Sequence, residues 1–319
     1  MPVRETELSA RNNFSHSAAD LDRFRQVQRL AYDIALKVEA QLRPGMTEAE
    51  VAALLAATQI QQGVFQFYHE PFAWFGNRTR LEPEHLENPD TTKPSDTKEL
   101  TAAAAAVTIQ PHPTFFPTDV SLADGMPVIL DLAPAVEGIC ADVGYSCVIG
   151  KNKTFASLDA GLARIRTMLV EGIRGGETLR NLHRLLDQLL AERGWENCHE
   201  HYPTRGLGHL VFPLEPDPDR MSPVSGMGTA AAESLLAAGA AALESDTCFP
   251  IWNDSTSSDH PATPGIWAIE PHIGRDGVGV KFEELLVVTE DDAFWLDDHL
   301  PHVLRWAAAR YSTESFRRG

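Results

Sequence analysis

Two segments of this sequence have the pattern of a β-hairpin that carries an acidic residue on each arm. In the first, Asp131 has apolar residues on both sides, and Asp142 precedes a second apolar stretch. Such runs predict buried strands. If the two acids face each other across an antiparallel pair, the turn falls at Val136-Glu137, beside Gly138. The pattern therefore predicts two carboxylates that face each other on one sheet.

The second segment, near the C-terminus, has the same arrangement. Glu270 and Glu283 are placed symmetrically about Asp276-Gly277. Asp-Gly is a strong hairpin signal because both central residues of a type I′ turn need positive φ. In this register Glu283 faces Glu270, whereas the neighbouring Glu284 points to the opposite face of the sheet. We therefore expect Glu283 to share a site with Glu270.

Four carboxylates that are buried together need cations, because like charges repel strongly in a low dielectric. His209, which follows Gly206-Leu-Gly, could add an imidazole. Four oxygen donors and one imidazole suit two divalent first-row ions, such as Mn, Fe, Co or Zn. Each acid alone could instead be a solvated or salt-bridged acid, and His209 alone could be a core or surface histidine. Two separate acid-bearing hairpins favour the metal site.

The order Asp, Asp, His, Glu, Glu resembles that of a known enzyme family. The sequence also has a Gly-Leu-Gly-His motif ending at His209, an Ile-Glu-Pro motif around Glu270, and the ending Phe-Glu-Glu-Leu-Leu-Val-Val-Thr-Glu-Asp. Together these motifs resemble the M24 family of methionine aminopeptidase, prolidase, aminopeptidase P and creatinase, over roughly Leu21–Leu296. The resemblance implies the α+β pita-bread fold, with an antiparallel sheet, flanking helices and two pseudo-symmetric halves.

The resemblance also implies roles for the residues that match the family motifs. Enzymes of this kind hydrolyse an amide bond with two divalent ions, and Glu270 corresponds to the acid that also shuttles a proton. The five implied ligands are Asp131 on one ion, Asp142 and Glu283 bridging both, and His209 and Glu270 on the other.

Several other histidines are candidates for contacting the substrate. In the family, a histidine upstream of the first aspartate contacts the scissile amide, and His112 has a suitable position, although between two prolines it could equally be a rigid loop element. The second histidine that usually follows the ligand histidine is missing after His209. We expect His201, His260 or His272 to take its place near the substrate.

An aromatic segment that includes Trp74 and Phe75 precedes a stretch rich in Pro, Asp, Glu and Thr. In the family the equivalent region borders the substrate pocket, so these two side chains are candidates for substrate binding. The alternative is a buried strand and its turn.

Helical periodicity and the motifs together define one catalytic domain. We expect an N-terminal arm over residues 1–20, a pita-bread domain over 21–300 with an exposed insertion around 80–100, and a C-terminal tail over 301–319. The expected helices are Leu21–Leu42, Glu48–Gln62, Phe155–Gly172 and Thr178–Arg193.

The formal net charge of −18 argues against nucleic-acid and anionic-membrane partners, which need clustered Lys and Arg. The N-terminus lacks the apolar core of a secretion signal, and there is no apolar run long enough to span a bilayer. The sequence therefore predicts a cytoplasmic protein, with a small-molecule or short-peptide substrate and a homodimer as a reasonable assembly.

Three functions are compatible with this pattern. The first is a dinuclear metal-dependent hydrolase that cleaves an amide bond of a small peptide, similar to an X-Pro dipeptidase or aminopeptidase. The second is a non-peptidase with a diiron carboxylate site for oxidative or lyase chemistry on a small metabolite. The third is a catalytically inactive binding module, which predicts gaps among the five ligands.

Overall fold

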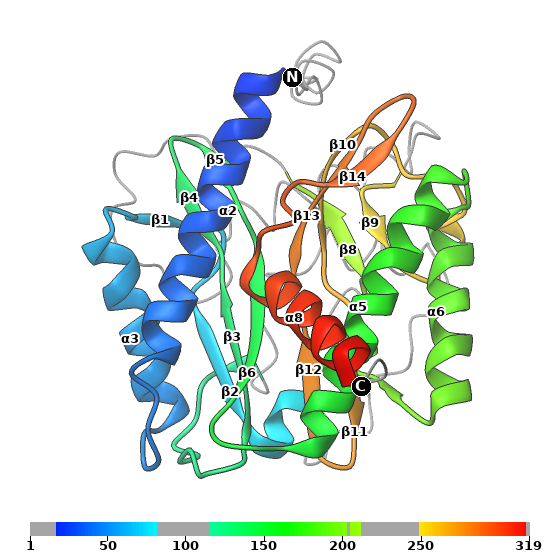
Figure 1. Ribbon diagram of the computed structural model, residues 1–319. Coiled ribbons are helices and arrows are strands. Elements are labelled where there is room, and N and C mark those ends of the chain that lie inside the picture. The colour runs from blue at the N-terminus through cyan, green and yellow to red at the C-terminus, as the bar shows by residue number, and fades with distance from the viewer. Residues whose placement is uncertain (1–16, 82–114, 203–204, 212–248, 317–319) are drawn as a thin grey trace, which may run out of the picture.

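The computed structural model describes residues 17–81, 115–202, 205–211 and 249–316, in an α+β arrangement (Figure 1). Four helices lie within a few residues of the ranges that periodicity predicts. Helix α5 shows why, because Leu158, Leu162, Ile165 and Leu169 recur every three or four residues and are all buried. The helices are α2 (Ala18–Glu39), α3 (Glu48–Gln61), α5 (Lys153–Arg174), α6 (Leu179–Arg193) and α8 (Pro301–Phe316), with 3-10 turns η1 (Gly76–Arg80), η3 (His199–His201) and η4 (Thr256–Ser258).

The N-terminal half contains two three-stranded antiparallel sheets, in the orders β2-β3-β6 and β1-β4-β5. Helices α2 and α3 lie on the outer side of this half, at the left of Figure 1. Their apolar faces share one core with the sheet residues beneath them. The strands are β1 (Gln66–Phe67), β2 (Phe72–Phe75), β3 (Pro127–Leu132), β4 (Pro134–Val136), β5 (Ile139–Cys140) and β6 (Val143–Val148).

The register predicted for the first acidic hairpin is wrong by two residues. Asp131 pairs with Gly144 and not with Asp142. The central turn residues are Glu137 and Gly138, with φ of 51° and 79°. A type I′ turn needs positive φ at both positions, which the branched Val136 disfavours. A shift of two residues keeps side chains on the same face, so Asp131 and Asp142 still lie together.

The C-terminal half contains a five-stranded sheet in the order β14-β13-β10-β8-β9 and a three-stranded sheet in the order β12-β11-β7. Helices α5 and α6 lie on its outer side, at the right of Figure 1. The strands are β7 (Glu196–Asn197), β8 (Gly208–Leu210), β9 (Ile251–Trp252), β10 (Gly265–Ile269), β11 (His272–Arg275), β12 (Val278–Lys281), β13 (Glu284–Val288) and β14 (Ala293–Trp295).

The register predicted for the second hairpin is confirmed. Ile269 pairs with Glu284, and the turn residues Asp276 and Gly277 both have positive φ. As expected, Glu284 points away from Glu283. It is fully buried and forms a two-pronged ion pair with Arg166, at 2.7 and 2.9 Å.

The two halves are joined directly at their acidic hairpins. The amide of Glu283 donates to the carbonyl of Gly144 at 2.9 Å. Beside it, the hydroxyl of Ser146 donates to the carbonyl of Lys281 and accepts from its amide. These bonds fix the position of one acidic hairpin relative to the other.

The C-terminal residues differ from the expected tail. Residues 301–316 form helix α8, which crosses between the two halves in Figure 1. His302 and Trp306 are buried, and the His302 ring stacks on Phe282 with centroids 5.5 Å apart. At the other end, residues 18–20 of the expected arm belong to α2. Most of the expected insertion, and His112, lie outside the described residues.

No helix in the described ranges combines the length and apolar character needed to cross a membrane.

Replacement of Gly279 by Ala tests how β12 packs on η1. A Cβ at this position would lie 2.0 Å from the backbone oxygen of Thr79, which cannot rotate away. We expect a loss of about 1–3 kcal/mol in the free energy of unfolding, measured by denaturant titration. Gly175→Ala is the matched control, because Gly175 is in the αR conformation and its nearest contact is 3.3 Å. Equal stability of the two variants would contradict this packing.

Candidate metal centre

The five side chains expected to bind metal come from the ends of strands and converge between the two halves. Asp131 lies in β3 and His209 in β8, whereas the other three acids lie in breaks between strands. In these breaks the backbone bonds to a different segment, and the amide of Glu270, for example, donates to the carbonyl of Leu207 at 2.9 Å. A strand break therefore lets each acid turn toward the centre while its backbone stays paired.

A buried lysine lies in the middle of the carboxylates. The Nζ atom of Lys281 is 2.7 Å from Asp131, 2.9 Å from Glu283 and 3.1 Å from Glu270. Gly144 makes room for its stem, because a Cβ there would lie 2.3 Å from Cε of Lys281. The ammonium of Lys281 thus holds three of the four acids together.

A second cation-binding feature is the pair of triads that share Asp142. One consists of His69, Asp131 and Asp142, and the other of Asp142, His209 and Glu283; in each, the potential ligand atoms lie within 4.8 Å of one another. Nε2 of His69 is 3.2 Å from Asp131 and 3.0 Å from Asp142. Asp142 is therefore shared by two neighbouring groups that could each hold a cation.

Burial is the main cause of the pKa shifts of the acids in this cluster, and an imbalance of charge among the carboxylates adds to it. Burial, followed by the charges of Asp142 and Glu270, raises the pKa of Glu283 well above its usual value. Burial also raises the pKa of Glu270. Burial disfavours the charge on Lys281, but Asp131 and Glu283 outweigh it and raise the pKa of Lys281. A divalent ion would relieve this imbalance.

The histidines respond to the same imbalance in the opposite sense. Burial lowers the pKa of His69, yet Asp142 and Asp131 outweigh burial and raise that pKa well above its usual value. The pKa of His209 is also raised, because its contact with Asp142 exceeds the cost of burial. For Asp142 itself, burial is outweighed by His69 and His209, which lower its pKa.

The donor set fits two divalent first-row ions. Four carboxylates and the imidazoles of His69 and His209 lie close together, and such a mixture of hard oxygen and imidazole donors suits Mn, Fe, Co or Zn. Lys281 contacts carboxyl groups that an ion would also use, those of Asp131 and Glu283. An ion in this place therefore competes with the ammonium.

His272, one of the three histidines expected near the substrate, is held by its neighbours. Its Nε2 donates to the carbonyl of Thr79 at 2.6 Å, so Nδ1 accepts from the hydroxyl of Tyr202 at 3.0 Å. Burial, together with the charge of Lys281, lowers the pKa of His272 to about 3. His272 is therefore a neutral histidine that positions Tyr202, whose ring centroid is 5.2 Å from Nζ of Lys281.

The other expected substrate residues have different surroundings. His201 is exposed on η3, and Nε2 of His260 accepts from the amide of Phe249 at 3.0 Å. Trp74 and Phe75 are at most 1% exposed and belong to strand β2, which pairs with β3. The structure thus favours the buried-strand alternative for the two aromatic residues.

Sequence reasoning missed His69, Lys281 and Tyr202. Lys281 could have been found, because it lies two residues before Glu283 and side chains at i and i+2 of a strand share a face. His69 offered no such signal. It lies among aromatic residues, far from every expected ligand in the sequence, and only the chain fold brings it to Asp131.

Replacement of Lys281 by Met tests the role of the ammonium. The variant leaves three buried carboxylates without their counter-charge, so we expect the metal-free protein to lose about 3–5 kcal/mol in the free energy of unfolding. We expect Mn²⁺ to restore much of this loss, because the ion supplies the missing positive charge. Thermal and denaturant unfolding with and without Mn²⁺ measure both effects.

The control for this variant is Lys37→Met, since Lys37 is exposed and its Nζ contacts only the neutral Gln62 side chain at 2.7 Å among the bonds described. If Lys281→Met is as stable as this control without metal, the ammonium does not neutralise the cluster.

Comparison with solved structures places the fold among peptidases. The X-Pro aminopeptidase of Thermotoga maritima matches with a TM-score of 0.59 and 17% identity, over 92% of this chain and 64% of that one. Dipeptidase PepE of Mycobacterium ulcerans matches with a TM-score of 0.57 and 21% identity, over 94% of this chain and 63% of that one. The prolidase of Pyrococcus furiosus matches with a TM-score of 0.59 and 16% identity, over 91% of this chain and 66% of that one. The chain thus spans less than two thirds of each of these structures.

No curated protein matches the chain significantly. The model of one protein family, Metallopeptidase family M24, matches residues 22–290. This range contains both acidic hairpins, His209 and the strand breaks at the acids. The pita-bread arrangement expected from the resemblance is confirmed by this match and by the solved structures. This chain belongs to metallopeptidase family M24.

Proposed function

We propose that this protein is a dinuclear metal-dependent hydrolase that cleaves an amide bond of a small peptide with proline after the scissile bond. The observation that carries the proposal is the convergence of three acids and two histidines in two triads that share Asp142, with Glu270 beside them on Lys281. Family membership and the fold support a hydrolase. The preference for proline rests on similar structures described as an X-Pro aminopeptidase and a prolidase, and matched dipeptides test it separately.

We assign the ligands from the triads and from the family resemblance together. By the triads, Asp131 and His69 would hold one ion and His209 the other, with Asp142 shared. The resemblance adds Glu270 to the second ion and Glu283 to both. Two divalent ions in these positions would supply an activated water and polarise the carbonyl of the scissile amide. Tyr68 stacks on His209 with centroids 5.7 Å apart and an interplanar angle of 9°, which orients that imidazole.

Glu270 is the acid best placed for proton transfer. Its side chain is 17% exposed, whereas those of Asp131, Asp142 and Glu283 are 3–9% exposed. Burial raises its pKa, which brings the carboxyl group closer to neutral pH and suits a group that accepts and returns a proton. We therefore assign the proton-shuttle role to Glu270, as the family resemblance implies.

The activity test is hydrolysis of matched dipeptides. Metal-free protein is reconstituted with Mn²⁺, Co²⁺, Fe²⁺ or Zn²⁺ in turn, and amine release is measured from dipeptides with proline or alanine in the second position. We expect activity only after metal addition, and faster release from the proline substrate. Equal rates for both substrates would retain the hydrolase and reject the proline preference.

Replacement of Asp142 by Asn tests the shared ligand. Asp142 belongs to both triads, so we expect loss of bound metal and at least about a 10²-fold fall in kcat/KM. Asp119→Asn is the control, because Asp119 is exposed and belongs to neither triad. Metal content by mass spectrometry and the dipeptide assay give the two readings. Full activity in Asp142→Asn would overturn the proposed centre.

A second candidate is a diiron enzyme that acts on a small metabolite. The presence of His69 favours it, because four carboxylates and two imidazoles equal in number the donors of carboxylate-bridged diiron sites in other folds. Oxygen consumption by the Fe²⁺ form, with no dipeptide cleavage by any metal form, would favour this candidate. Metal binding without either reaction would favour the inactive binding module.

A further inference from the structure

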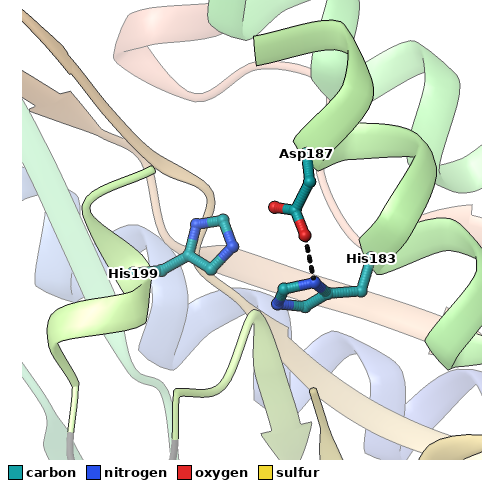
Figure 2. Close-up of side chains that lie close together, drawn as sticks. All are labelled: His183, Asp187 and His199. Carbon is teal, nitrogen blue, oxygen red and sulfur yellow. Dashed lines mark hydrogen bonds and ion pairs between the residues drawn. The ribbon is translucent and has the colours of Figure 1, made fainter. Parts of the chain in front are cut away.

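A second group of metal-binding side chains lies outside the proposed dinuclear centre. His183 and Asp187 lie one turn apart on helix α6, and His199 faces them from η3 (Figure 2). One potential ligand atom from each residue lies within 4.8 Å of those of the other two. None of the three takes part in the two triads around Asp142. The cluster therefore needs its own explanation.

The two histidines are buried without enough polar partners. His183 is 1% exposed and His199 is 0% exposed. Among the described residues, neither nitrogen of His199 nor Nε2 of His183 makes a hydrogen bond of acceptable geometry. Buried polar atoms without partners are costly and uncommon in folded proteins. A ligand that binds a nitrogen of His199 would remove part of that cost.

One distance between potential ligand atoms in the cluster matches that of a tetrahedral metal site. Nδ1 of His183 and Oδ2 of Asp187 are 3.2 Å apart. Two ligands at bond lengths of about 2.0–2.1 Å from a tetrahedral ion lie roughly 3.3 Å apart. An ordinary ion pair within the helix would explain this distance, but it would not explain why His199 places its ring 5.1 Å from the His183 ring. The position of His199, as a third potential ligand, therefore favours a metal site over a simple ion pair between His183 and Asp187.

The surroundings hold the three side chains in a suitable state. Nδ2 of Asn197, in strand β7, donates to Oδ1 of Asp187 at 2.6 Å and leaves Oδ2 for a ligand. A bond of this kind commonly orients a metal-binding carboxylate. Neither ring nitrogen of His199 has a hydrogen-bond partner among the described residues, so either nitrogen could bind an ion.

We propose that His183, Asp187 and His199 bind a single zinc ion or a similar divalent ion, separate from the dinuclear centre. Two imidazoles and one carboxylate are a common zinc donor set, and a water completes the tetrahedron. The side chain of Asp187 is 35% exposed, which gives the water and the ion a path from solvent.

The ion would tie α6 to the turn that leads to the dinuclear centre. Turn η3 is followed by Tyr202, which bonds to His272 and lies over Lys281. The role that follows is structural, because the ion fixes the segment from which Tyr202 reaches the carboxylates.

The test is zinc stoichiometry in full-length protein whose dinuclear centre is disabled by Asp142→Asn and Glu283→Gln. Zinc-loaded protein is gel-filtered, and metal per chain is measured by mass spectrometry. We expect one zinc per chain in this background and none after the further change His199→Leu. His201→Leu is the matched control, because His201 lies on the same turn with its side chain exposed, and it should retain the zinc.

Two further readings keep the test independent of the dinuclear centre. Without disabling changes, His199→Leu should lower the zinc content by one ion per chain, whatever number the unaltered protein binds. Asp187→Asn, which preserves the size of the side chain, should weaken zinc binding at least about tenfold in competition with a chromophoric chelator. Neither reading depends on enzyme activity, so failure of the proposed function would not affect them.

Spectroscopy separates a true site from loose association. Co²⁺ in the disabled background should give the visible absorption of a tetrahedral site with nitrogen and oxygen ligands, and His199→Leu should abolish it. Circular dichroism verifies that each variant is folded. The proposal is overturned if the folded background variant binds no zinc, or if it binds the same amount of zinc after His199→Leu.

Discussion

The crowding of three carboxylates around the ammonium of Lys281 is the interaction on which the rest of this structure depends. Lys281 contacts Asp131, Glu270 and Glu283, and these acids come from both halves of the molecule. Burial makes each charge costly unless an opposite charge is near, so the two halves are stabilised only in the arrangement that brings the acids to the cation. The pKa of Glu283 is raised by burial and then by the charges of Asp142 and Glu270, so an imbalance of charge adds to the cost of burial. The same imbalance makes the site attractive for divalent ions.

The strand breaks convert this crowding into a site. If Glu270 and Glu283 lay within regular strands, their backbones would pair with each other; instead, their amides bond to Leu207 and Gly144. The breaks also separate adjacent acids by function. Glu283 faces the cluster, whereas Glu284 forms a buried ion pair with Arg166 on the opposite face. A one-residue change in register would exchange these two environments.

The sequence predicted the four main helices, both acidic hairpins and the five side chains that converge. It was accurate where local chemistry is decisive, as at Asp276-Gly277, where the turn type fixes the register. It placed the first turn one residue too early, at Val136-Glu137 and not at Glu137-Gly138. Gly138 lies in or next to the turn in both cases, so its presence alone does not fix the register. The positive φ of both Glu137 and Gly138 in the structure does. It also predicted no helix after Leu300, although the apolar face of α8 packs on Phe282.

What the sequence determined by itself is therefore the periodic part of the molecule: its helices, its hairpins, the order of its acids and, through that order, its family. These depend on residues close together in the chain, whose spacing sets which face each side chain occupies. The tertiary structure alone decided that His69 joins Asp131 and Asp142, that Tyr202 lies over Lys281, and that His199 meets His183 and Asp187. These contacts join residues with no periodic relation, so they are fixed by how the elements pack and not by any local pattern.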